Sequence, residues 1–214
     1  MKKLLATSFL LLAPFAASAG ELYTSVGLPG LTLGYAEALG ESVTLRGDVT
    51  TVGSISRKRT VQAIDYDAHF KSDRVALLAD WFVAGKVRLT GGATFQNTRA
   101  DLYGHGNGGT IKIGNTSYVA GPSDQFDAHV QYPHAMPYLG IGFGHAKSSV
   151  AGWTFIADFG ISIGRPDVSG SASGPLLSQT VTQQDIDQEL ASIRESTAKY
   201  RGIPQLSLGL GYRF

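Results

Sequence analysis

Hydrophobic and polar residues alternate along most of this chain, and the alternation is clearest near its end. Leu206, Leu208, Leu210, Tyr212 and Phe214 are apolar or aromatic, whereas the residues between them are Ser, Gly, Gly and Arg. Side chains alternate across a β-strand, so this pattern predicts one apolar face and one polar or bare face. The same period of two recurs in earlier segments, and the chain is therefore predicted to be a β-protein.

Eight alternating segments are separated by short stretches of glycine, proline and polar residues, which are typical of turns. Within the fourth segment the apolar residues change parity between Phe70 and Val75, which predicts a β-bulge near Ser72 and Asp73. The predicted strands cover residues 21–28, 31–39, 42–57, 61–82, 86–103, 127–145, 151–168 and 203–214.

A long polar insert at 104–126 follows the fifth predicted strand. Inside it, residues 110–119 have the pattern of a small hairpin that turns at Gly114 and Asn115. This insert is therefore predicted to contain some structure of its own.

A second long insert, at 169–202, precedes the last strand and contains the one predicted helix. Thr182 followed by Asp185 resembles a capping box, and Ile186, Leu190 and Ile193 fall on one helix face. Two interpretations remain open: the helix rests on the outer rim of the barrel, or it is a solvated and partly frayed loop helix.

The first residues form a different kind of segment. Two lysines, an apolar run from Leu4 to Phe15 and small residues up to Ala19 predict a secretory signal peptide over 1–19. Without Lys2 and Lys3 the chain has 16 basic against 17 acidic residues, which argues against a nucleic-acid partner. The chain contains no cysteine, so disulfides do not stabilise the exported protein.

The aromatic end resembles the last strand of bacterial outer-membrane β-barrels, whose assembly machinery reads a terminal Phe with apolar residues at alternate positions upstream. With the signal peptide and the strand plan, the chain is similar to the small-barrel superfamily that includes the OmpA transmembrane domain, OmpX, OmpW and the opacity proteins. The resemblance implies an all-β fold over 20–214: an eight-stranded antiparallel transmembrane up-and-down β-barrel with one short helix in an outer loop. The assembly signal would comprise Leu206, Leu208, Leu210, Tyr212 and Phe214.

The same resemblance implies a location and partners. The protein would be integral to the outer membrane after cleavage near Ala19, in contact with outer-membrane lipids and lipopolysaccharide. The barrel-assembly machinery would be its partner during biogenesis, and the outer loops could meet extracellular ligands.

Barrels of this kind place the C-terminus at the periplasmic rim, with short periplasmic turns and longer outer loops. Tracing back from the last strand makes 39–41, 83–85 and 146–150 periplasmic, and it places both long inserts outside. Aromatic residues on the apolar face then gather near the periplasmic ends, as an interfacial girdle requires. These residues are Tyr35, Trp81, Phe143, Trp153, Tyr212 and Phe214.

Charged residues on the polar faces are predicted to point into the barrel. The interior of an eight-stranded barrel is just wide enough for side chains to fill it, and isolated buried charges are costly. A salt-bridge plug is therefore favoured over an ion-conducting path. The residues concerned are Arg46, Asp48, Asp80, Arg88, Asp158 and Arg213.

Histidines are the remaining candidates for chemistry. A metal site built from His105, Asp124, Asp127 and His129 would match no compact ligand spacing, so we predict neither a metal nor a cofactor.

Small-barrel enzymes that modify lipid A rely on His and Ser at the outer rim. Here His145 stands near Ser148 and Ser149 in a predicted periplasmic turn, whereas His69 and His129 show no evident Ser partner. The sequence thus favours a non-enzymatic surface protein with a filled lumen and an envelope or surface-interaction role. A narrow OmpW-like passage for small apolar solutes is the second hypothesis, and a lipid A-modifying enzyme is the third.

Overall fold

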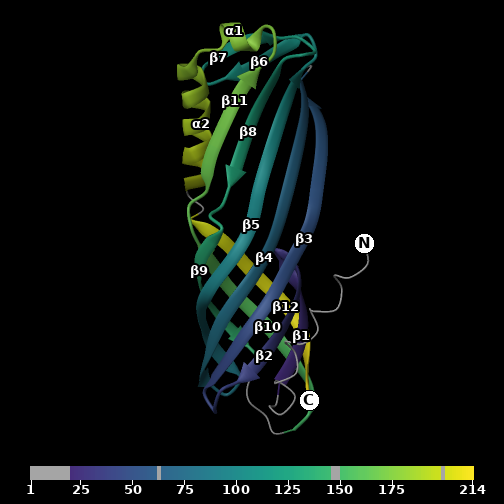
Figure 1. Cartoon of the computed structure of the whole chain (residues 1–214), viewed down its shortest axis with the longest axis vertical. Coiled ribbons are helices and arrows are strands. Elements are labelled where there is room, and N and C mark those ends of the chain that lie inside the picture. The colour runs from purple at the N-terminus through teal and green to yellow at the C-terminus, as the bar shows by residue number, and fades with distance from the viewer. Residues whose placement is uncertain (1–19, 62–63, 146–149, 199–200) are drawn as a thin grey trace, which may run out of the picture.

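The computed structural model describes residues 20–61, 64–145, 150–198 and 201–214 (Figure 1). The predicted signal peptide 1–19 lies outside these residues. The strands are β1 (Gly20–Leu28), β2 (Gly30–Ala38), β3 (Val43–Val61), β4 (Ile64–Ala84), β5 (Val87–Gly106), β6 (Gly109–Ile113), β7 (Thr116–Ala120), β8 (Gln125–Gln131), β9 (Ala135–Phe143), β10 (Gly152–Ile163), β11 (Asp167–Ser173) and β12 (Gly202–Arg213), and the helices are α1 (Leu177–Thr180) and α2 (Gln183–Ala198).

Eight of these strands form a closed antiparallel barrel. Their order around the wall is β1, β2, β3, β4, β5, β9, β10 and β12. The last strand then pairs with the first, from Glu21 opposite Arg213 to Leu28 opposite Leu206. The predicted eight-stranded up-and-down barrel is therefore confirmed.

The barrel wall is much taller on one side than on the other. Strands β3, β4 and β5 contain 19, 21 and 20 residues, whereas β1 and β2 contain 9 each. The far halves of the long strands therefore continue beyond the short ones, past the closed part of the wall. There β8 and β11 join them, which gives a five-stranded extension in the order β11, β8, β5, β4, β3. Figure 1 shows this extension rising above the barrel, with α2 beside β11.

Two of the predicted strands are each split in two. Segment 127–145 becomes β8 and β9 around Pro133, and segment 151–168 becomes β10 and β11 around Pro166. Proline cannot donate to a strand ladder, so each break frees the chain from its neighbour in the wall. As a result, β9 and β10 pair within the barrel, whereas β8 and β11 pair with each other in the extension.

The register shift predicted near Ser72 and Asp73 is present beside these residues, but on the facing strand and not in β4. Strand β4 runs through Ser72 and Asp73, and the register shifts on the facing strand β3, between Thr51 and Gly53. The change of apolar face in β4 has another cause, which is the passage from the barrel into the extension.

The faces of the sheet exchange polarity at this passage. In the barrel, leucines such as Leu77 point outward and are about half exposed, while the inward face carries polar residues such as Arg74. Strand β4 continues without a shift into the extension, so Phe70 lies on the same inner face as Arg74, and His69 lies on the outer face. Cross-strand pairs share a face, so Leu102 lies on the inner face and Asp101 on the outer face. The barrel is thus apolar outside and polar inside, whereas the extension is polar outside and has its apolar residues on the inner face, beside Arg57 and Arg59 of β3.

A cap covers the end of the extension. The hairpin of β6 and β7 turns at Gly114 and Asn115, as predicted, and Ile111 and Ile113 are buried with Phe126 of β8 and Leu177 of α1. Among the described residues, no helix is long and apolar enough to cross a membrane.

Helix α2 packs onto the same cluster. Leu190 is 5% exposed, and Ile186 and Ile193 pack against the buried residues, so the predicted helix face is confirmed. The backbone N–H of Asp185 donates to the Thr182 hydroxyl at 3.2 Å, as the predicted cap requires. The helix is therefore packed and is not a solvated loop helix, but it lies against β11 and β6 above the barrel and not on the barrel rim.

Candidate functional site

The barrel interior is crossed by a quartet of alternating charges. Arg46 Nε lies 2.6 Å from Asp80 Oδ2, and Arg46 Nη2 lies 3.2 Å from Asp158 Oδ1. Arg88 contacts the same two acids, Asp158 at 2.9 Å and Asp80 at 3.6 Å. These residues come from β3, β4, β5 and β10, so the quartet joins opposite sides of the wall.

A second cluster lies on the side of the quartet that faces the extension. Arg74 Nη2 donates to Asp48 Oδ1 at 2.9 Å, and its Nη1 donates to the side chain of Gln205. Tyr23 donates its hydroxyl to the other oxygen of Asp48 at 3.0 Å. Asp48 is thereby held by two donors from different strands.

A third cluster occupies the end near the C-terminus. Glu21 accepts from Arg213 Nη2 at 2.6 Å, and its other oxygen lies 2.6 Å from His145 Nδ1. The His145 ring is buried and packs edge-on against Tyr23, with 4.5 Å between ring centroids.

Together these clusters fill the lumen and balance its charge. The three clusters hold four arginines and four carboxylates, and each arginine has a carboxylate within 4 Å. A cavity lined by Tyr23, Asp48, Arg74 and Tyr138 has a volume of about 20 Å³, which is room for one water molecule. The arrangement therefore makes a fixed plug.

All six residues predicted for the lumen lie in these clusters, but five further members were not predicted: Arg74, Gln205, Glu21, Tyr23 and His145. Arg74 was missed because the expected bulge placed it in an irregular stretch, although its alternation with Val75 could have found it. Glu21, Tyr23 and His145 gave a weaker signal, because β1 is not paired with β9 in the wall and these side chains meet only across the lumen.

No protein-family model matches the chain, and no curated protein matches it either. Among solved structures, CarO of Acinetobacter baumannii is 21% identical, with a TM-score of 0.59 over 92% of this chain and 98% of CarO. CarO2 of the same organism is 19% identical, with a TM-score of 0.60 and the same coverage. The chain has the fold of a small outer-membrane β-barrel. The resemblance predicted from the sequence is thus confirmed at the level of fold.

Ail, the attachment invasion locus protein of Yersinia pestis, aligns over 92% of this chain and 94% of its own. Its identity of 14% and TM-score of 0.37 are too low to carry an argument.

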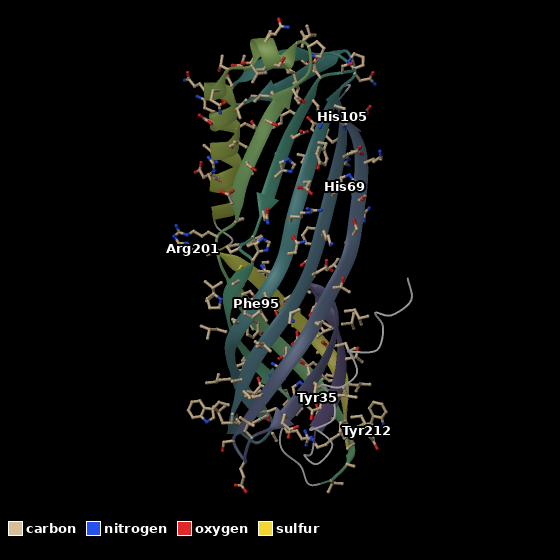
Figure 2. The ribbon with its side chains drawn as sticks, in the orientation of Figure 1. Tyr35, His69, Phe95, His105, Arg201 and Tyr212 are labelled. Atoms are coloured by element: carbon tan, nitrogen blue, oxygen red, sulfur yellow. The ribbon has the colours of Figure 1, made fainter. Side chains whose placement is uncertain are left out.

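The aromatic residues predicted as a girdle lie at the end of the barrel that holds the C-terminus, and Figure 2 labels Tyr35 and Tyr212 there. Trp81 and Trp153 are 60% and 75% exposed, and Trp153 packs edge-on against Tyr212 at 5.2 Å. The alternate residues from Leu206 to Phe214 all point outward and are about half exposed.

The residues considered for a metal site are used separately. Asp124 accepts three backbone N–H groups, His129 Nδ1 lies 2.8 Å from Asp101, and Asp127 accepts from Gln125. Within the described ranges, no group of three or more His, Cys, Asp or Glu side chains could hold a metal ion.

His69 does have a serine partner, which the sequence did not reveal. Ser56 Oγ lies 2.8 Å from His69 Nδ1 across β3 and β4, on the outer face of the extension. Asp101 stands directly opposite His69 on β5, but its carboxylate bonds His129. A serine and a histidine are thus together without the third group that orients the base in a hydrolytic triad.

Asp185 ties the cap hairpin to α2. Its carboxylate accepts hydrogen bonds from Thr182 at 2.5 Å, from Tyr118 at 2.6 Å and from Thr116 at 3.0 Å. These hydroxyl donors, Thr182 first, hold the pKa of Asp185 below its ordinary value of 3.8.

Acidification should therefore loosen the cap. Because the folded-state pKa of Asp185 is depressed, its contribution is present above about pH 3.8 and is lost as the pH falls through the lower folded value. We expect the protection factors of the amides in the β6–β7 turn, which compare the observed exchange rate with the intrinsic rate at the same pH, to fall there. Asp185→Asn should exchange faster at neutral pH and lose most of this acid response; an unchanged response would show that Asp185 does not hold the hairpin.

Proposed function

We propose that this protein is exported through the signal peptide 1–19, cleaved near Ala19, and resides in the bacterial outer membrane as a non-enzymatic surface barrel. The lumen is a structural plug, and the extension with its cap is displayed outside the cell. Its role is in the envelope or in surface interaction. Outer-membrane lipids, including lipopolysaccharide, surround the barrel, and the barrel-assembly machinery inserts it.

The observation that carries this proposal is the exchange of polarity between the barrel and the extension. An apolar outer face of half-exposed leucines costs free energy in water but not in lipid. Where β4 passes Asp73, the outer face becomes polar and the inner face apolar, as a sheet that leaves the membrane for water requires. A single strand such as β4 would thus pass from the hydrocarbon layer into water near Asp73.

The filled lumen predicts a closed barrel. In planar bilayers, the purified protein is expected to give no steady current, because the quartet of Arg46, Asp80, Arg88 and Asp158 joins opposite walls. Replacing Arg88 and Asp158 together by Ala should raise conductance above that baseline. A steady current from the unaltered protein would contradict the plug.

The orientation predicts where a protease can act on intact cells. Cleavage should fall within 104–126 or 169–202, which contain the cap, α2 and their connections. The turn at 83–85 joins β4 and β5 at the periplasmic end and should be spared. Cleavage at 83–85 in cells with an intact outer membrane would invert the topology.

A second candidate is a passage for small apolar solutes. The inner face of the extension supports it, since Ile55 and Leu102 point inward and are 43% and 40% exposed. A solute held there would still face the polar plug below. It would therefore have to leave sideways, above the short strands β1 and β2.

A further inference from the structure

Two grooves run along the outer face of the barrel over β2, β3, β4 and β5. The groove nearer the extension has a volume of about 520 Å³ and apolar walls that include Leu31, Leu33, Val75 and Phe95. Figure 2 labels Phe95 between the C-terminal end of the barrel and the extension.

The second groove continues the first toward the C-terminal end. It has a volume of about 540 Å³, and Gly47, Leu77, Ala79 and Gly91 line it. Strand pairing places Gly47 opposite Leu77. The next outward-facing pair along the same two strands is Val49 and Val75, which belong to the first groove. The two together form one apolar furrow along β4.

Small residues make the furrow deep. A Cβ added at Gly47 would lie 3.8 Å from Leu77, and one added at Gly91 would lie 3.9 Å from Leu139, so a side chain could be accommodated at either position in ordinary van der Waals contact. Neither glycine has a backbone conformation that demands glycine. Their effect here is to keep the surface hollow.

The furrow ends at a polar row, where the sheet enters the extension. Thr51, Asp73 and Asn97 lie side by side on β3, β4 and β5, and Thr51 donates to Asp73 at 2.7 Å. This row stands where the outer face changes from apolar to polar. It therefore lies at the depth of lipid headgroups.

The next outward-facing row carries two cations. Lys71 and Arg99 are directly opposite each other on β4 and β5. Like charges at such positions are destabilising, so the pairing needs an explanation. Acids do stand nearby: Lys71 lies 3.1 Å from Asp73, and Arg99 Nε lies 3.6 Å from Asp101.

These two acids neutralise the charges of Lys71 and Arg99 only in part, because both acids are shared with other donors. Asp73 also accepts from Thr51, and Asp101 is closer to His129, at 2.8 Å, than to Arg99. Arg99 Nε is 3.6 Å from the Asp101 carboxylate, and the Arg99 side chain is 52% exposed. A guanidinium and an ammonium side by side are well suited to the oxygens of a phosphate.

We propose that this face binds one phosphate-bearing lipid of the outer leaflet, with an acyl chain in the furrow and a phosphate between Lys71 and Arg99. The site rests on the proposed membrane location. Such a site differs from general contact with lipid because particular strands, two cations and a groove form it. Bound phosphate would also relieve the repulsion between the two opposed cations.

The test uses the mature protein in phosphatidylcholine nanodiscs that contain either diphosphoryl lipid A or the same lipid without its phosphates. Native mass spectrometry counts the lipid A that stays with the released barrel. We expect one lipid A per barrel, and at least tenfold less of the dephosphorylated form. Lys71→Gln with Arg99→Gln should lower retention of the phosphorylated lipid at least tenfold, and Val75→Trp, which fills the groove, should lower it too.

A matched control removes two cations elsewhere, one on the extension and one on the cap. Lys58→Gln with Lys112→Gln should retain lipid A as the unaltered chain does, since neither residue borders the groove. Equal retention by the Lys71/Arg99 variant, or of the dephosphorylated lipid, would overturn the site while leaving the membrane location standing. Failure of the unaltered protein to show a heat-modifiable folded band in the nanodisc would overturn both.

Discussion

Asp80→Ala is expected to lower the free energy of unfolding by about 3–5 kcal/mol, among the largest effects of any single substitution in this barrel. The Asp80 side chain is fully buried and contacts both Arg46 and Arg88. It also accepts from the Thr90 hydroxyl at 2.6 Å. Its removal leaves two guanidinium groups facing a single remaining acid, Asp158. Urea unfolding of the barrel in lipid vesicles, followed by its heat-modifiable band, measures the loss.

Two controls separate this effect from a general loss of charge. Asp67→Ala removes an acid whose partner, Lys58, is 81% exposed, and it should cost less than about 1 kcal/mol. Adding Arg46→Met to Asp80→Ala should recover part of the stability, because Arg88 and Asp158 still pair at 2.9 Å. If Asp80→Ala cost no more than Asp67→Ala, the quartet would not stabilise the barrel.

Leu208→Arg is expected to destabilise the barrel by about 2–4 kcal/mol, the range for a cation near the bilayer midplane. Leu208 lies in the middle of β12, between Val26 and Ala157, and is 53% exposed on the outer face. An arginine there would have to leave water for hydrocarbon. The folded fraction in vesicles across a urea series measures the change.

The same substitution on the extension provides the control. Ser171 of β11 is exposed and shares its face with Asp127 of β8, on the side that turns polar beyond the barrel. Ser171→Arg should change stability by less than about 0.5 kcal/mol. A similar loss at both positions would mean that the polarity exchange does not mark the membrane boundary.

Alternation predicted the barrel strands well because a wall between lipid and a polar interior imposes a period of two on every strand. The same reasoning failed where the surroundings change along one strand. In β4 the apolar residues pass from Phe70 on the inner face to Val75 on the outer face, and this was interpreted as a bulge. The two prolines, Pro133 and Pro166, were the available signal for the strand breaks.

The lumen residues could be predicted as a set but not as pairs. Arg46, Asp80, Arg88 and Asp158 all follow from inward parity, whereas their partners depend on register and on which strands face each other across the lumen. Local sequence patterns reveal neither the register nor which strands face each other. Ser56 and His69 show the same limit, because they meet only through the pairing of β3 with β4.

The seam between β1 and β12 has a consequence for how the barrel forms. Glu21 and Arg213, which bond across it, are 192 positions apart, so closure depends on one of the most distant contacts in the chain. Contacts between distant residues form slowly. Until β12 is in place, β1 and β10 each present an unpaired edge, and a bilayer offers no water to satisfy those backbone groups. Closure of the ring is therefore the step that commits the chain to its folded state.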